Sequence, residues 1–160
     1  MIKKLSSAEL ELVSGLAYSI WPIVYNKMIP QEQITYMLKW MYAEETLKLA
    51  YNSGDSFFAY YVDNNAVGFL HLHPEENTLK LEKIYIHPDF HFRGIGEKLI
   101  SFCVKFAREK TFKEIRLQVN RENPAVNFYL HLDFVIERKL DVDIGGGFFM
   151  NDYEMKKLIQ

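Results

Sequence analysis

The spacing of hydrophobic residues changes along the chain and divides it into a helical part and a part rich in strands. In about the first third, apolar residues recur at helical spacing, which predicts helices over residues 8–25 and 31–42 and a short helix ending near residue 52. Apolar and polar residues then alternate, as they do in half-buried strands, and turn-forming residues separate the runs. The alternation predicts strands over residues 56–62, 66–72 and 78–87.

The second half of the chain contains both patterns. It predicts helices over residues 96–111 and 124–132 and strands over residues 114–119, 134–142 and 149–158. Three strands joined by short turns, followed by a strand-helix-strand crossover, are typical of an α/β fold with a mixed sheet of six to seven strands and helices on both faces. At 160 residues, the chain is expected to form one domain spanning residues 1–160.

The junction between the third predicted strand and the next helix has the composition of an anion-binding loop. It ends in Arg93-Gly94-Ile95-Gly96. Gly94 and Gly96 lack a Cβ, so the backbone can turn tightly and come close to a ligand. The first N–H groups of a helix have no carbonyl partners within the helix, and the helix dipole adds to their attraction for anions. The junction therefore suits a pyrophosphate, although glycines before a helix also form simple turns.

The strand before this loop contains a change of phase. Leu79 and Leu81 alternate as in a half-buried strand, but the apolar positions then shift to Ile84 and Ile86. A β-bulge around residues 82–83 would account for the shift, because one extra residue reverses the face of every side chain that follows. A bulge also leaves backbone groups without a partner in the sheet, and these become available to a ligand.

A second group of polar and aromatic residues follows the strand over residues 114–119. Asn123 is a good helix N-cap, and Pro124 suits the first position of a helix. The short helix that follows brings Phe128 and Tyr129 together near its end.

These two groups of residues resemble two signature blocks of the GNAT superfamily of acetyl-CoA-dependent N-acetyltransferases. Residues 91–96 are similar to its Q/R-x-x-G-x-G/A loop, and residues 123–134 are similar to its N-x-x-A-x-x-F-Y-x-x-x-G-F block. The likeness covers about residues 57–158. His91 replaces the usual Gln or Arg, and Asp133 replaces a Gly that is expected to hold a turn.

The resemblance implies acetyl-CoA as co-substrate and direct attack of an amine on it in a ternary complex. Ile84 and Ile86 would offer backbone groups to the pantetheine arm, and the N–H groups of residues 91–97 would hold the pyrophosphate. The residues expected to bind CoA are Ile84, Tyr85, Ile86, His91, Phe92, Arg93, Gly94, Ile95, Gly96, Glu97, Asn123 and Phe128.

Two residues are candidates for proton transfer. An alkyl ammonium with a pKa near 10.4 is neutral in only about one molecule in 2,500 at pH 7, so a group must accept its proton. Glu82 lies on the strand beside the expected ligand, and the resemblance supports it as the general base; the alternative is a surface residue paired with Lys80 or Lys83. Tyr129 matches the family tyrosine that protonates the departing thiolate, and the alternative is a core aromatic residue.

The acceptor is expected to be a primary amine. Residues 81–96 and the end of the chain look most like the PaiA-type bacterial enzymes that acetylate spermidine and spermine. Acidic residues could give the acceptor cleft a field that attracts a polycation, or they could be scattered surface acids: Glu32, Glu44, Glu45, Asp141 and Asp143. The competing hypotheses are acetylation of a protein or peptide N-terminus, acetylation of another small amine such as an aminoglycoside, and a CoA-binding sensor without turnover.

Composition argues against several other classes of partner. The formal net charge of −2 argues against duplex DNA, because neutralising its phosphates needs a basic face, so no nucleic-acid partner is expected. No apolar run approaches the roughly 18 residues that a membrane span requires, so no membrane partner is expected. The single cysteine, Cys103, cannot form an intramolecular disulfide, which fits a cytoplasmic location, and it is expected to be a buried hydrophobic residue. The sequence leaves the oligomeric state open, with a homodimer as one alternative.

Two further sets of residues are expected to be structural. His71 and His73 share one face of a predicted strand, but no third ligand of a suitable type is near them, so no metal is expected. Four aromatic residues at helical spacing are expected in the core rather than in a ligand cage: Trp21, Tyr25, Tyr36 and Trp40.

Overall fold

The computed structural model describes residues 1–160 and contains one mixed sheet with five α-helices. The seven strands are β1 (Ile2–Lys4), β2 (Ser56–Val62), β3 (Asn65–Glu75), β4 (Thr78–Ile86), β5 (Glu114–Asn120), β6 (Val135–Gly145) and β7 (Phe148–Leu158). The helices are α1 (Leu10–Val24), α2 (Gln31–Met41), α3 (Glu44–Asn52), α4 (Ile95–Glu109) and α5 (Ala125–His131), with short 3-10 turns η1 (Ser7–Glu9) and η2 (Pro88–Phe90). The strand order is β1-β2-β3-β4-β5-β7-β6, which confirms the predicted mixed α/β sheet.

The chain forms two compact units. The first contains residues 1–73 and 83–99, and the second contains residues 74–82 and 100–160. The boundary passes through β4 and α4, so each of these elements begins in one unit and ends in the other.

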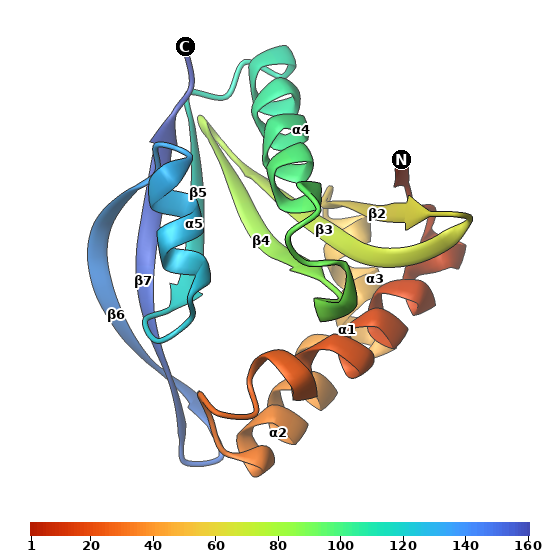
Figure 1. The fold of residues 1–160 in the computed structure, drawn as a ribbon, viewed down its shortest axis with the longest axis vertical. Coiled ribbons are helices and arrows are strands. Elements are labelled where there is room, and N and C mark those ends of the chain that lie inside the picture. Colours follow the sequence, from red (N-terminus) through yellow and green to blue (C-terminus); the bar gives the residue numbers. More distant parts are fainter. The chain divides into compact units, whose positions relative to one another are not determined.

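The first unit contains three antiparallel strands and three helices. β2 pairs with β1 on one side and with β3 on the other. α1 packs against α2 and α3, and Figure 1 shows α1 and α2 side by side. The core of this unit is formed by fully buried residues from these elements: Val13, Ile20, Trp21, Ile34, Phe57, Phe69, Leu70 and Leu72. The sequence analysis missed β1, because three residues are too few to show an alternating pattern.

The second unit is arranged around β5. β5 runs parallel to the first half of β4, from the pair Thr78↔Glu114 to the pair Leu81↔Leu117, and antiparallel to β7. β7 pairs antiparallel with β6, and Figure 1 shows β5, β7 and β6 next to one another. The buried residues here include Leu79, Leu81, Ile115, Leu117, Phe134 and Met155.

Most of the predicted core positions are buried, but not all of them are. Leu79 and Leu81 are buried as predicted, whereas Ile84 and Ile86 are only partly covered. The bulge around residues 82–83 stays a prediction. The assignment of Trp40 to the core is wrong, because its side chain is 48 % exposed and lies on the outer face of α2.

The turn after α5 has the left-handed backbone that the glycine position predicts. Asp133 has a φ of 69°, and the N–H of the next residue, Phe134, donates to the carbonyl of Tyr129 at 3.1 Å, which closes the end of the helix. Glycine adopts this conformation without the steric cost that a Cβ brings.

We therefore expect Asp133→Gly to stabilise the protein by up to about 1 kcal/mol, measured as the free energy of unfolding in urea. The only ion pair that this change removes is a 3.9 Å contact with Lys157 at an exposed carboxylate, which contributes little. Asp133→Ala is the control, and it should not be stabilising, because Ala keeps the Cβ that makes left-handed backbone costly. A lower stability for Asp133→Gly would contradict the assigned role of this turn.

Candidate active site

The carboxyl end of β4 is held against β3 by a backbone contact at Gly68. A Cβ at this position would lie 2.7 Å from the carbonyl oxygen of Tyr85 and 3.3 Å from the Cα of Ile86, so only glycine allows the two strands to come this close. The N–H of His87 also donates to the carbonyl of Val67 at 2.8 Å. These contacts fix the point at which the chain leaves the sheet. The loop that follows, residues 88–94, leads into the predicted CoA-binding junction and is called the ligand loop below.

The loop is closed by its own histidines. The ring of His87 accepts a hydrogen bond from the N–H of Asp89 at 3.2 Å, at the start of η2. Nε2 of His91 donates to the carbonyl of Ile86 at 2.8 Å. The side chain of His91, which replaces the usual Gln or Arg, therefore ties the loop back to the end of β4.

The loop turns into α4 through two residues with left-handed backbone. Phe92 has a φ of 62° and Gly94 a φ of 76°. The first backbone hydrogen bond of α4 runs from the N–H of Lys98 to the carbonyl of Gly94 at 3.1 Å, so the N–H groups of residues 95–97 precede it. A Cβ built on Gly94 would have no atom within 4 Å, so the space beside this residue is open. Open space beside free helix N–H groups fits a bound phosphate.

The side chains of the junction point in different directions. The buried Ile95 anchors the first turn of α4, whereas Gly96 is partly covered and Glu97 is exposed. The guanidinium carbon of Arg93 lies 4.8 Å from the centre of the Phe90 ring. Residues 91–97 thus run from the end of η2 into the first turn of α4, within the first unit. Their role in binding CoA stays a prediction.

Tyr85 joins an aromatic cluster that contains two of the predicted core residues, Trp21 and Tyr25, although the sequence does not predict their contact with Tyr85. Its hydroxyl lies 2.8 Å from the hydroxyl of Tyr25, at the end of α1, and its ring centre lies 5.5 Å from that of Trp21 and 5.7 Å from that of Phe69. Tyr42 contacts the same cluster, and burial raises the pKa of its phenol well above the ordinary value. The cluster fixes the side chain of a residue whose backbone is expected to contact CoA.

Glu82 lies in the second unit and is partly covered. Its carboxylate pairs with Nζ of Lys80 at 3.3 Å, and both side chains are about three-quarters buried. Lys80 is one of the two partners that the sequence suggests for Glu82, and it forms this ion pair in the structure.

Asn123, Phe128 and Tyr129 also lie in the second unit. Oδ1 of Asn123 accepts a hydrogen bond from the N–H of Ala125 at 2.9 Å, which confirms the predicted cap, although α5 begins one residue after Pro124. Tyr129 is buried, with its ring centre 5.4 Å from that of Phe128 and 5.6 Å from that of Phe134. The phenol is therefore held in one orientation by neighbouring rings.

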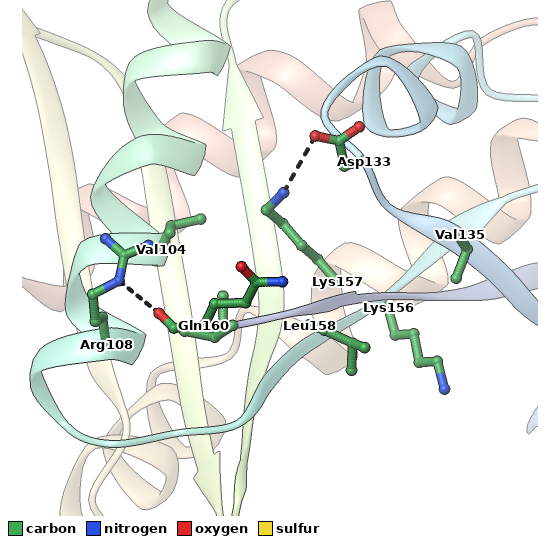
Figure 2. A pocket seen from close by; sticks show the side chains of 9 residues that line it. Val104, Arg108, Asp133, Val135, Lys156, Lys157, Leu158 and Gln160 are labelled. Carbon is green, nitrogen blue, oxygen red and sulfur yellow. Dashed lines mark hydrogen bonds and ion pairs between the residues drawn. The ribbon is translucent and has the colours of Figure 1, made fainter.

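A shallow groove in the second unit contains none of these residues. Figure 2 shows it between the end of β7, the end of α4 and the turn at Asp133. Its basic side chains have partners within the chain: Nε of Arg108 donates to the carbonyl of Gln160 at 3.1 Å, and Nζ of Lys157 donates to the carbonyl of Leu132 at 2.9 Å. None of the residues expected to bind CoA lines this groove.

The two histidines considered for a metal site contact one carboxylate. Oδ2 of Asp55 lies 2.6 Å from Nε2 of His71, and Oδ1 lies 2.6 Å from Nδ1 of His73. Burial would raise the pKa of Asp55, but its bonds to the two rings outweigh burial and lower it. The structure contains no group of three or more side chains suited to hold a metal ion.

Two further observations concern the cysteine and the helices. Cys103 is fully buried, and burial raises the pKa of its thiol to about 12, as expected for a structural cysteine. None of the helices combines the length and the apolar character needed to cross a membrane.

The chain is similar to known acetyltransferases in sequence and in fold. The model of the acetyltransferase (GNAT) family matches residues 21–134. The chain is 28% identical to spermidine N(1)-acetyltransferase of Thermoplasma acidophilum over 155 residues, covering 93% of this chain and 94% of the relative. It is 25% identical to streptothricin acetyltransferase A of Bacillus subtilis over 128 residues, covering 71% of this chain and 74% of that relative.

A solved structure of similar fold contains coenzyme A. The crystal structure of the PaiA N-acetyltransferase of Thermoplasma acidophilum in complex with coenzyme A superimposes with a TM-score of 0.82 and 26% identity, over 99% of this chain and 98% of the other. The family model covers more than half of the chain, and it includes the loop at residues 91–97 and the buried Tyr129. The chain therefore belongs to the GNAT acetyltransferase family and is an N-acetyltransferase with acetyl-CoA as its donor.

Proposed function

We propose that the protein transfers the acetyl group of acetyl-CoA to a primary amine of a polyamine such as spermidine or spermine, by direct attack in a ternary complex. The amine nitrogen attacks the thioester carbonyl carbon, the C–S bond breaks, and an amide forms while CoA leaves as a thiolate. The observation that carries the proposal is the open, left-handed junction at residues 91–97, combined with the likeness to a spermidine acetyltransferase over 93% of the chain.

The donor is bound mainly by backbone groups in this proposal. The N–H groups of residues 92–97 hold the pyrophosphate, because the N–H of His91, which the sequence also offered, donates to the carbonyl of Pro88 at 3.1 Å. The pantetheine arm follows Ile84 and Ile86. Strand amides near Ile84 polarise the thioester carbonyl as its oxygen gains charge. The anchored end of β4 supports this arrangement, because backbone donors stabilise charge best when they are fixed before the reaction.

Replacing Gly96 tests the pyrophosphate site. Gly96→Val adds a branched side chain where the backbone must approach the ligand, so we expect CoA affinity to fall below the detection limit of titration calorimetry. Gly15→Ala is the matched control, because Gly15 is also a helical glycine and a Cβ there meets no atom within 4 Å. It should keep wild-type CoA affinity and gain slightly in stability. Wild-type affinity in a folded Gly96→Val variant would exclude the assigned pyrophosphate site.

Glu82 and Tyr129 carry the proton transfers in this proposal. Glu82 accepts the proton of the acceptor ammonium, directly or through water, and Tyr129 donates its phenolic proton to the departing thiolate. The partly covered carboxylate and the buried, ring-packed phenol support these roles, because both groups are held in position by their surroundings.

We expect Glu82→Gln and Tyr129→Phe each to lower kcat with little change in CoA affinity, Tyr129→Phe by about ten- to a thousand-fold. The measurement is steady-state thiol release together with CoA calorimetry.

Two matched variants separate these roles from structural ones. Lys80→Met removes the ion pair between Lys80 and Glu82 but keeps the carboxylate, so it should retain most of kcat. Tyr60→Phe removes the hydroxyl of another buried tyrosine and should leave kcat unchanged. If Lys80→Met lost as much activity as Glu82→Gln, the carboxylate would act through its ion pair and not as a base.

The acidic residues that could attract a polycation differ in their surroundings. Asp141 pairs with Arg121 at 2.7 Å, Asp143 accepts from the N–H of Gly145 at 2.8 Å, and Glu44 pairs with Lys48 at 2.7 Å. Glu32 and Glu45 are exposed on α2 and α3. Any attraction for a polycation is therefore expected to come from these helices more than from the hairpin of β6 and β7.

A turnover screen tests the acceptor. Spermidine and spermine should release thiol from acetyl-CoA, and their KM should rise between low and physiological salt by more than that of a singly charged amine, because screening weakens Coulomb attraction. A peptide with a free N-terminus and an aminoglycoside complete the panel. Thiol release with the peptide and none with millimolar polyamine would contradict the polyamine assignment and favour protein acetylation. The absence of release with every amine, despite CoA binding, would favour a sensor.

A further inference from the structure

Phe92 is an unusual residue in the ligand loop. Phe92 is fully exposed, with a relative exposure of 106%, which is higher than that of any other large apolar residue in the chain. Its backbone φ is 62°. A bulky side chain adopts left-handed backbone at a steric cost, and an exposed ring adds nothing to the core. Folding alone therefore gives no reason for a phenylalanine at this position.

The neighbours of Phe92 keep it projecting from the loop. His91, on one side, is tied to the carbonyl of Ile86 at 2.8 Å. Arg93, on the other side, lies over the ring of Phe90 at 4.8 Å. The ring of His91 meets that of Phe92 edge to face, with centres 6.3 Å apart. Strained backbone that is held by its surroundings is a feature of ligand-binding segments.

We propose that the ring of Phe92 stacks on the adenine base of bound CoA. The proposal rests on the pyrophosphate site proposed above, and the adenosine of CoA is joined to that pyrophosphate through its ribose. Phe92 comes two residues before Gly94, where the backbone turns towards the phosphates. The pantetheine arm follows β4, so the loop side of the pyrophosphate receives the adenosine. Base stacking on an exposed aromatic ring needs no partner other than the flat faces of the two rings.

The test compares CoA with a ligand that lacks its nucleotide. 4′-Phosphopantetheine keeps the arm and one phosphate but lacks the second phosphate of the pyrophosphate, the 3′-phosphorylated ribose and the adenine. Phe92→Gly should weaken CoA binding by about ten-fold or more in calorimetry and leave the affinity for 4′-phosphopantetheine unchanged. Phe92→Trp should retain CoA affinity, and Phe92→Leu should lose it, because Leu is apolar but has no flat ring. Leu49→Ala, at another exposed apolar residue of the first unit, is the control without effect.

The outcomes distinguish a failure of the stacking proposal from a failure of the proposed pyrophosphate site. Selective loss of CoA affinity in Phe92→Gly and Phe92→Leu supports the stacking. Unchanged CoA affinity in both variants overturns it, as does an equal loss for both ligands, which would mean that Phe92 shapes the loop. If the wild type binds CoA but Gly96→Val binds it equally well, the pyrophosphate site itself fails, and the stacking proposal fails with it.

Discussion

The close approach of β3 and β4 at Gly68 is the constraint on which the ligand loop depends. A Cβ at Gly68 would lie 2.7 Å from the carbonyl oxygen of Tyr85, so any other residue would push the end of β4 away from β3. The bond from His87 to Val67 fixes the next residue. The ligand loop over residues 88–94 starts at this point and leads into α4. Backbone contacts therefore position the first turn of α4 before a ligand binds, and an anion bound there would cause little movement.

Tyr85 couples this constraint to the helices of the first unit. Its backbone belongs to the anchored strand, while its hydroxyl meets that of Tyr25 and its ring packs on Trp21 and Phe69. A change in α1 would therefore reach the strand proposed to bind the pantetheine arm. The same element thus contributes to donor binding through its backbone and to the packing of the helices through its side chain.

Local patterns predicted most of the elements, because helical spacing, strand alternation, caps and glycine turns are properties of neighbouring residues. The cap at Asn123 and the left-handed turn at Asp133 are examples. Contacts between distant residues could not be predicted in this way. Tyr25 and Tyr85 are 60 residues apart in the sequence, and Asp55, just before β2, contacts His71 and His73 of β3 without any motif. Trp40 fitted the helical spacing of the core, but only the packing of α2 determines which of its faces is covered.

The claim that the first turn of α4 binds the pyrophosphate is tested most directly by observing its backbone amides. In a titration of the 15N-labelled protein with CoA, the account predicts that the amide resonances of Gly94, Ile95, Gly96 and Glu97 show the largest shifts. The amides of the groove in the second unit, such as those of Lys156 and Lys157, should change little. Saturating CoA binding that leaves the amides of residues 94–97 unmoved and shifts those of the groove would contradict the account.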